Sequence, residues 1–506
     1  MSANPSPEPL VFDRRAPECA LVIFGANGDL TRRKLVPALY NLWRQARLAA
    51  GFAVLGTSRT ALSDDEFRAR MRPAVEEFSE SGPVETAVWE EFSQGLFYEP
   101  GHLEDAAFYS RLKARLGQIA AARQTGGNVL FYLSTQPSHY GPVAGQLGAA
   151  GLAGQTSAGW RQLVVEKPFG RDLAGARRLS VEVQRVFPES EIYRIDHYLG
   201  KETVQNILAF RFANGIFEPL WNCRYIRQVQ IMAAESIGVA GRGAFYEDVG
   251  ALRDMIQNHL LQVMATVAME APARLDAVFT RDERAKVLRS IRPLRREEVA
   301  RRAVAGQYGP GGVGGSDLLG YRQEAGVHPE SQIETYAAAT FFIDNWRWAG
   351  VPFYLRAGKR LPQRATEIAI QFASAPHLLF SDPAAAEPNL LVLGIQPEEG
   401  ISLKFHSKLP GTEMRLRLVS MDFQYGSGFG VRSPPAYETL LLDAMEGDPA
   451  LYTRQDMVEA CWEAVGPVLE VWANTGFAFP NYAAGSWGPA EADELLERDG
   501  WQWRQP

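Results

Sequence analysis

The sequence predicts an α/β domain at the N-terminus and an α+β domain with a large, mainly antiparallel sheet at the C-terminus. In the N-terminal part, short apolar runs alternate with helical segments, which indicates parallel strands joined by crossover helices. Later stretches alternate in polarity with few helices between them, as in an antiparallel sheet with one covered face. At 506 residues the chain is too long for one hydrophobic core. We therefore expect two domains, 1–190 and 191–506, with a flexible tail over 1–17.

The N-terminal domain is predicted as a series of strand and helix units. Residues Ala20–Phe24 form a continuous apolar run, typical of a strand buried on both faces. A helix is predicted after the glycine turn that follows, because Leu35, Leu39 and Leu42 recur at helical spacing. Further strands are predicted within 52–59, 128–135 and 160–170, and a helix over 172–187.

The C-terminal domain is predicted from a series of strand-like stretches between Tyr225 and Tyr425. Two helical segments, 248–269 and 436–445, are expected to cover one face of their sheet. The glycine-rich stretch 305–326 has no periodicity and is expected to be a mobile surface loop. The predicted strands lie within 226–236, 336–348, 351–359, 365–374, 389–396, 400–408 and 414–423.

Charge and cysteine content argue against several classes of protein. The formal net charge of −7 disfavours a general nucleic-acid surface, which needs a clustered basic field. No run of about 18 apolar residues occurs, so no membrane span is predicted. Cys19, Cys223 and Cys461 show no metal-ligand spacing and suit a reducing compartment. We expect a cytoplasmic protein without a metal, since the proline-rich N-terminus also lacks the features of a signal peptide.

The segment GANGDL, 25–30, follows the first strand, at the position where a Rossmann-type domain binds dinucleotide phosphates. Glycines let backbone amides approach a pyrophosphate, and the following helix supplies a positive dipole. The segment departs from G-x-G-x-x-G, because Asn27 and Leu30 replace two glycines and Gly28 is added. An ordinary tight turn between a strand and a helix is the alternative interpretation.

The end of the second strand indicates which dinucleotide would bind. It places Thr57, Ser58 and Arg59 where an NAD-specific site usually has an acidic residue. Hydroxyl groups and a guanidinium suit the 2′-phosphate of NADP, with NAD as the weaker alternative. An exposed loop arginine is the other interpretation.

The segment RIDHYLGKE, 194–202, crowds several titratable side chains around one glycine. On a helical turn, His197 and Lys201 would share one face beside the phenol of Tyr198. That arrangement would grip a phosphate monoester, and a solvated helical face with incidental charges is the alternative.

A second candidate is His259, which falls on the apolar stripe of a predicted helix, between Ile256 and Val263. It is either a core histidine satisfied by hydrogen bonds or a general base in a dry pocket, oriented by a carboxylate.

On these motifs the chain resembles the glucose-6-phosphate dehydrogenase family. GANGDLTRRKL is similar to the family's loop GASGDLAxRKL, EKPFG recurs unchanged, and RIDHYLGKE is the family's signature nonapeptide. The resemblance continues through DMIQNHLLQ, VPFYLRAGK and AYETLLLDAMEGD, and so covers nearly the whole chain. It implies oxidation of D-glucose 6-phosphate to 6-phospho-D-glucono-1,5-lactone with reduction of NADP, the first step of the pentose phosphate pathway.

The resemblance also implies roles for single residues. His259 would accept the proton of the sugar's C1 hydroxyl, and Asp196 would orient the imidazole. His197, Tyr198 and Lys201 would hold the phosphate. The implied substrate contacts are Lys167, His197, Tyr198, Lys201, Glu235, Asp254, Lys359 and Arg364. The implied cofactor contacts are Gly25, Ala26, Asn27, Gly28, Asp29, Leu30, Thr31, Arg32, Arg59, Tyr140 and Lys167.

Some positions depart from the family pattern. Asn27 stands where many members have serine, a replacement that should spare the loop. Ala365 and Ala369 stand where members with a second, structural NADP have basic residues, so no second site is expected. Pro168 either fixes the side chain of Lys167 or simply ends a strand.

Two rival functions are considered. A sugar oxidoreductase of the glucose-fructose oxidoreductase or inositol dehydrogenase type would also carry EKP, but would not use the phosphate grip. A catalytically silent nucleotide-binding scaffold would be expected to lack Asp196 or His259, and both are present. An exposed face of the second sheet must be buried, which predicts a homodimer or homotetramer.

Overall fold

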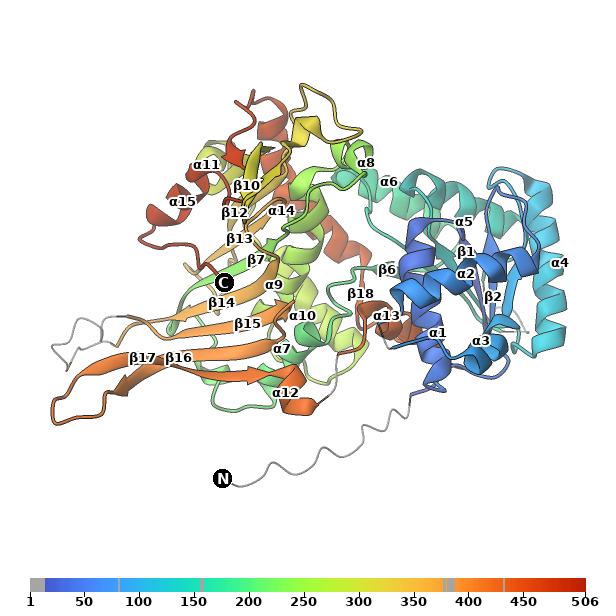
Figure 1. Ribbon diagram of the computed structural model, residues 1–506, viewed down its shortest axis with the longest axis horizontal. Helices are drawn as coiled ribbons and strands as arrows, with labels where there is room; N and C mark the ends of the chain where they lie inside the picture. Colours follow the sequence, from blue (N-terminus) through green and yellow to red (C-terminus); the bar gives the residue numbers. More distant parts are fainter. Residues whose placement is uncertain (1–13, 81, 155–158, 376–378, 380–386, 431–432) are drawn as a thin grey trace. The chain divides into compact units, whose positions relative to one another are not determined.

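The computed structural model describes residues 14–80, 82–154, 159–375, 379, 387–430 and 433–506. The chain forms two compact units, and the predicted α/β plus α+β fold class is confirmed (Figure 1). The first unit consists of the chain up to Gly200 together with 274–281 and 434–458, and the second unit consists of the remaining residues.

The flexible tail was expected over 1–17. Its residues 1–13 lie outside the described residues. Arg14, by contrast, donates to Asp443 at 2.7 Å, and the Ala16 amide donates to the carbonyl of Arg47 at 2.9 Å. Residues 14–17 are therefore anchored by hydrogen bonds to the first unit.

The first unit is built on a seven-stranded sheet in the order β18-β6-β5-β4-β1-β2-β3. All neighbouring strands are parallel except β18 and β6. Without β18, this is the 3-2-1-4-5-6 order of Rossmann-type sheets. Strands β1, β2 and β4 are buried at every position, which accounts for their continuous apolar runs. The strands are β1 (Ala20–Phe24), β2 (Ala53–Thr57), β3 (Leu96–Tyr98), β4 (Val129–Leu133), β5 (Arg161–Val165), β6 (Ile192–Ile195) and β18 (Tyr452–Thr453).

Three helices of this unit begin at side-chain caps. Ser63 forms a capping box with Glu66 at the start of α2, and Asp105 and Asp172 cap α4 and α6. The helices are η1 (Thr31–Leu35), α1 (Val36–Arg44), α2 (Asp64–Phe78), α3 (Thr86–Ser93), α4 (Ala106–Arg123), α5 (Tyr140–Ala149), α6 (Leu173–Gln184) and α13 (Ala436–Glu446), with short 3₁₀ turns η2 (Pro137–His139) and η3 (Glu189–Glu191).

Helix α13 corrects the expectation that 436–445 covers the second sheet. It belongs to the first unit, where Leu440 and Met445 share a hydrophobic core with Leu39 and Tyr40 of α1. The chain then forms β18, in which Tyr452 pairs with Ile195 of β6. A boundary at 190 therefore leaves a late segment out of the first unit, because chain order does not reveal such long-range pairing.

The second unit is built on an eight-stranded sheet in the order β17-β16-β15-β14-β7-β13-β12-β8. Its pairs are antiparallel except for the parallel pair of β7 and β13. The strands are β7 (Ile226–Ala234), β8 (Ala303–Gly306), β12 (Tyr336–Phe342), β13 (Pro352–Gly358), β14 (Ala365–Phe372), β15 (Leu390–Gln396), β16 (Gly400–Lys408) and β17 (Leu416–Gln424).

One continuous helical segment covers the middle of this sheet, as 248–269 was expected to do. It consists of η5 (Leu252–Leu260), which is a π-helix, and α9 (Leu261–Ala268). η5 packs on β7, β12 and β13, and α7 (Glu202–Phe212) packs on α9 and β15. The smaller helices of the unit are η4 (Glu218–Leu220), α8 (Gly243–Glu247), α11 (Arg296–Arg302), η6 (Tyr321–Gln323), α12 (Tyr425–Phe429) and α15 (Ala490–Glu497), while α10 (Ala277–Arg289) and α14 (Gln455–Ala473) contribute residues to both units.

The glycine-rich stretch 305–326 is ordered structure rather than the expected loop. It forms a hairpin of β10 (Gly311–Val313) and β11 (Ser316–Leu318) around Gly314 and Gly315, both at positive φ. The preceding β9 (Tyr308–Gly309) pairs with β19 (Tyr482–Ala483). A Cβ at Gly311 would lie 2.1 Å from the carbonyl oxygen of Ala484, so the glycine permits a close backbone approach that periodicity cannot show. No helix within the described ranges is long and apolar enough to cross a membrane.

Candidate functional site

The glycine turn lies where β1, β2 and β4 end. The amides of Gly25 and Ala26 both donate to the carbonyl of Thr57, at 2.9 and 3.0 Å. Gly25 has a φ of +87°, and a Cβ there would lie 2.2 Å from the carbonyl oxygen of Ser134. Only glycine fits this position, so the turn is held tightly against two strand ends.

The helix after the turn begins with a π segment, η1, rather than the expected α-helical turn. Thr31 is fully buried, and its hydroxyl donates to the carbonyl of Gly25 at 3.3 Å. Thr31 therefore stabilises the turn from within, although the resemblance places it among the cofactor contacts. Asp29 and Arg32 are exposed beside it.

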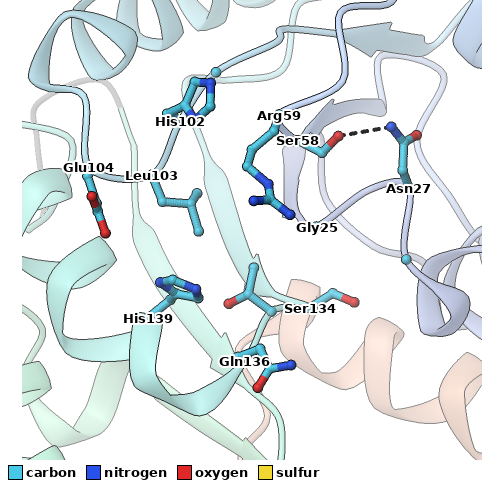
Figure 2. A pocket seen from close by; sticks show the side chains of 13 residues that line it. Gly25, Asn27, Ser58, Arg59, His102, Leu103, Glu104, Ser134, Gln136 and His139 are labelled. Atoms are coloured by element: carbon cyan, nitrogen blue, oxygen red, sulfur yellow. Dashed lines mark hydrogen bonds between the residues drawn. The ribbon is translucent and has the colours of Figure 1, made fainter. Parts of the chain in front are cut away.

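A cavity of about 440 Å³ opens beside this turn (Figure 2). It lies at the carboxyl ends of β1 to β4, the edge where open α/β sheets bind their ligands. Gly25, Asn27, Gly28, Ser58 and Arg59 of its lining were predicted from the sequence, whereas the residues that follow β3 and β4 were not, although ligands bind at the carboxyl ends of such strands. The lining residues are Gly25, Asn27, Gly28, Ser58, Arg59, Gly101, His102, Leu103, Glu104, Ser134, Thr135, Gln136 and His139.

Asn27 ties the glycine turn to the loop after β2. Its side-chain amide donates to Ser58 Oγ at 2.9 Å and to the phenol of Tyr98 at 3.3 Å (Figure 2). Ser58 and Tyr98 hydroxyls lie 2.7 Å apart, and Tyr98 donates onward to the carbonyl of Thr60 at 2.8 Å. Asn27 thus takes part in a network that positions the loop bearing Arg59.

Arg59 is exposed and directs its guanidinium into the cavity (Figure 2). Ser58 also lines the cavity, but Thr57 is fully buried and does not reach it. The expected pair of hydroxyls is therefore reduced to one. No carboxylate ends β2, and Glu104 is the single acidic residue in the lining, so the donors fit a 2′-phosphate better than a free ribose diol.

The carboxyl ends of β4 and β5 carry a carboxylate between two phenols. Glu166 Oε1 accepts from Tyr132 at 2.5 Å and from Tyr437 at 3.0 Å. Burial raises the pKa of the Glu166 carboxyl, although both phenols and Lys167 favour its charged form. The next residue, Lys167, is joined to Pro168 by a cis bond.

Tyr140, which the resemblance places near the nicotinamide, is buried at the start of α5. Its hydroxyl donates to the carbonyl of Thr135 at 3.4 Å. Burial, reinforced by the charge of Glu166, raises the pKa of this phenol well above its usual value, so the hydroxyl is neutral.

The segment 194–202 does not form the predicted helical turn. β6 ends at Ile195, and the buried carboxylate of Asp196 accepts from the amide of Tyr198 at 3.0 Å. Residues 197–200 form a turn, and Lys201 is the N-cap of α7. The helical-face argument for His197 and Lys201 is therefore wrong, because the helix begins only after Lys201. The ring centres of His197 and Tyr198 lie 5.1 Å apart within the turn.

In the second unit, Lys201 and Arg364 converge on a residue that sequence analysis missed. Lys201 Nζ and Arg364 Nη2 both donate to Gln396 Oε1, the latter at 3.3 Å. The amide nitrogen of Gln396 donates to Thr366 at 3.2 Å. Gln396 ends β15 and Arg364 precedes β14, its antiparallel neighbour, so strand pairing brings these distant residues together.

The ring of Tyr246 lies near three charged residues, Glu235, Asp254 and Lys359. We call these four residues the carboxylate cluster. Lys359 is 3% exposed, and its ammonium group donates to Glu235 and lies 5.0 Å from the centre of the Tyr246 ring. Burial, followed by the charges of Asp254 and Glu235, raises the pKa of Tyr246 well above its usual value. Glu235 and Lys359 directly follow β7 and β13, whose parallel pairing places both at one edge of the sheet.

His259 is 1% exposed, on the helical segment that also carries Asp254. Its predicted burial is confirmed, although the helix is of the π type. Asp196 and His259 belong to different units, and their pairing stays a prediction.

Both the 3-2-1-4-5-6 sheet and the cavity beside its glycine turn are typical of dinucleotide-binding enzymes with a second, substrate-binding domain. Family models match almost the entire chain: residues 22–206 match the NAD binding domain of glucose-6-phosphate dehydrogenase, and residues 208–504 match its C-terminal domain. The chain belongs to the glucose-6-phosphate dehydrogenase family.

Individual relatives agree with this assignment. The chain is 50% identical to glucose-6-phosphate 1-dehydrogenase of Aggregatibacter actinomycetemcomitans, over 97% of this chain and 98% of that protein. It is 46% identical to the enzyme of Chlamydia muridarum, over 96% and 97%.

Solved structures are similar as well. A glucose-6-phosphate dehydrogenase in complex with its substrate glucose-6-phosphate superimposes with a TM-score of 0.88 at 34% identity, over 98% of this chain and 100% of that chain. The Mycobacterium avium enzyme gives a TM-score of 0.82 at 36% identity, over 97% and 99%. The resemblance noted in the motifs is therefore confirmed over the full length.

Proposed function

We propose that the protein oxidises D-glucose 6-phosphate to 6-phospho-D-glucono-1,5-lactone with NADP as the electron acceptor. The observation that carries this proposal is the full-length similarity to a dehydrogenase solved with glucose-6-phosphate, in a chain that keeps RIDHYLGKE and a buried His259. The product would enter the pentose phosphate pathway, and the enzyme would work in the cytoplasm.

The nucleotide would lie in the cavity beside the glycine turn. The N-terminus of the helix after the turn would face its pyrophosphate, because the amides of Gly25 and Ala26 already donate to the Thr57 carbonyl. Arg59 would pair with the 2′-phosphate, supported by Ser58, which Asn27 holds in place. When bound, the nicotinamide supplies the hydride acceptor.

His259 would act as the general base. An imidazole held in a buried position can accept the proton of the C1 hydroxyl as hydride leaves the same carbon. Asp196 would orient the ring and stabilise the imidazolium, in the manner of the carboxylate of a catalytic triad. Its own carboxylate is already held in place by the Tyr198 amide, which supports a fixed orientation.

The substrate would be held at both ends. Lys201, His197 and Tyr198 would bind the phosphate, and the convergence of Lys201 and Arg364 on Gln396 supports a phosphate site with Gln396 as an additional member. Glu235, Asp254 and Lys359 of the carboxylate cluster would hold sugar hydroxyls, and Lys167 would contact both substrate and nucleotide.

A spectrophotometric assay for reduced nicotinamide tests this function. Glucose 6-phosphate with NADP is expected to be turned over far faster than glucose with NADP, because only the phosphorylated sugar can bind the proposed phosphate site around Lys201 and Arg364. NAD is expected to be the weaker acceptor. Equal turnover of glucose and glucose 6-phosphate would instead indicate a sugar dehydrogenase without a phosphate grip, and no turnover of either would contradict the proposal.

We also propose that the protein is a homodimer or homotetramer formed through β16 and β17. Ile401, Leu403 and Phe405 of β16 pair directly with apolar residues of β17 on the same face of the sheet. All six side chains are at least partly exposed in the single chain, and Met421 is 61% exposed. Such a contiguous apolar face is expected to be covered by a second copy of the chain.

A further inference from the structure

The helical segment that carries Asp254 and His259 begins without a cap from its own sequence. Gly250 has a φ of +70°, and helical backbone starts at Ala251, which makes no side-chain cap. The first amides of a helix have no partner within the helix, and leaving them unsatisfied in a buried site destabilises it. Ala251 and Leu252 are both buried.

A residue far away in the sequence satisfies these amides. Leu252 donates its amide to the Glu334 carboxylate at 3.1 Å, and Ala251 donates to the Glu334 carbonyl at 3.0 Å. Glu334 is 7% exposed and lies just before β12. A carboxylate at a helix N-terminus is also stabilised by the helix dipole.

The fit between Glu334 and Gly250 is close. A Cβ at Gly250 would lie 2.4 Å from one carboxylate oxygen of Glu334 and 2.7 Å from the other. Any side chain at Gly250 would therefore displace the carboxylate, in addition to being strained at positive φ.

The same segment also contacts Lys359, one member of the carboxylate cluster. The residue after Glu334, Thr335, accepts from the amide of Lys359 at 3.0 Å, and its hydroxyl lies 3.0 Å from the phenol of Tyr482. Residues 334 and 335 thus link the start of the helix with Asp254 and His259 to the strand end with Lys359. Burial raises the pKa of the Glu334 carboxyl, while the Leu252 amide and the charge of Arg253 oppose this.

We propose that Glu334 is a positioning residue for the reaction, which acts by fixing the N-terminus of the helix that presents Asp254 and His259. This inference rests on the proposed function. Glu334 touches neither the substrate nor the nucleotide in this scheme; its carboxylate sets where the helix begins, and hence where the base and a sugar-binding carboxylate stand.

Two variants of nearly equal volume separate the cap from simple packing. Glu334→Gln keeps an acceptor oxygen for the Leu252 amide, whereas Glu334→Met removes it without leaving a cavity. We expect Glu334→Met to lower kcat with glucose 6-phosphate about 10- to 100-fold and to raise its KM severalfold, because a small displacement of a catalytic group has such effects. Glu334→Gln is expected to retain most of the activity.

Three further measurements identify the cause. The Kd of NADP, read by fluorescence quenching, is expected to stay unchanged in both variants, because the nucleotide cavity lies in the other unit. Hydrogen exchange is expected to show loss of protection at Leu252 in Glu334→Met only, because Ala251 donates to the main-chain carbonyl of residue 334, which both variants keep. Gly250→Ala, which keeps the carboxylate but displaces it, is expected to reproduce the kinetics of Glu334→Met.

The inference is wrong if Glu334→Met shows wild-type kcat and KM, or if Glu334→Gln and Glu334→Met are impaired equally. Either result leaves the proposed function standing, provided that the wild-type protein reduces NADP with glucose 6-phosphate. If the wild type does not, the proposed function fails, and the exchange measurement still decides whether Glu334 caps the helix. If Glu334→Met does not fold, the kinetic test is made with Gly250→Ala instead.

Discussion

Lys359 and Glu235 show why single residues of this site differ in what their substitution can reveal. Lys359 is almost fully buried and paired with Glu235. Removing Glu235 would leave the buried ammonium of Lys359 without this partner, which lowers the stability of the fold. Substitutions of this pair would therefore mix loss of folding with loss of substrate binding. His259 and Arg59 allow cleaner tests.

His259→Ala is expected to lower kcat about 10²–10⁴-fold, because proton transfer by a positioned base contributes that much. The Kd of NADP should change little. The residual turnover can be measured by stopping the reaction after long incubation and quantifying the reduced nucleotide. Thr266→Ala is the matched control: Thr266 is buried on the same helical segment and donates only to its own helix, at the carbonyl of Gln262. Near-normal turnover in His259→Ala would remove it from the reaction.

Arg59→Ala is expected to raise the KM for NADP about 10- to 100-fold and to leave the KM for NAD nearly unchanged, since one charge-assisted contact to phosphate is lost. Steady-state kinetics with both nucleotides measure the KM for NADP and the KM for NAD in the variant and in the wild type. Arg72→Ala is the control, because Arg72 pairs with Glu76 on the exposed side of α2. An equal rise in the KM for NADP and for NAD would show that Arg59 does not bind the 2′-phosphate.

Among the elements, α13 shows how a buried carboxylate makes stability depend on pH. Asp443 on α13 is 2% exposed and accepts from Arg14 at 2.7 Å. Burial raises its pKa from 3.8 to about 7, despite the opposing charge of Arg14. A carboxyl whose pKa is raised by folding binds its proton more tightly in the native state. Its contribution is therefore largest at low pH and is lost as the pH rises through about 7.

Asp443→Asn, which mimics the protonated carboxyl, is expected to gain Tm relative to the wild type as the pH rises from about 5 to about 8. Differential scanning fluorimetry at both values measures this. Asp65→Asn serves as the control, because Asp65 is exposed and its pair with Arg68 lies at the surface. An equal difference in Tm at both pH values would contradict the assignment to Asp443.

The elements also show which local predictions succeeded. Strands such as Ala20–Phe24 and Ala53–Thr57 were predictable, because a parallel strand covered on both faces must be apolar throughout. Strands β3 and β18 were missed, since two or three residues are too few to show a pattern. The spacing of His197 and Lys201 suggested a helical turn, but α7 begins only at Glu202, because the spacing of charged residues does not fix where a helix starts.

The proposed assembly would depend on the apolar face of β16 and β17. Met421→Lys is expected to reduce the mass measured by light scattering from that of a dimer or tetramer towards that of a single chain, because a lysine ammonium cannot be buried there without a partner. Val181→Lys is the control, since Val181 is also half-exposed but lies on α6 in the first unit. A wild-type protein that is already monomeric at assay concentration would contradict the proposed assembly.

The sequence by itself determined the fold class, the strands buried on both faces, and the family, because burial and the nonapeptide leave patterns within short stretches of chain. It also located Gly25, Arg59 and His259. Only the tertiary structure decided that Gln396 joins Lys201 and Arg364, that α13 completes the first unit, and that Glu334 caps the helix of His259. These contacts join residues 82 or more positions apart, or depend on strand pairing, and no local periodicity records them.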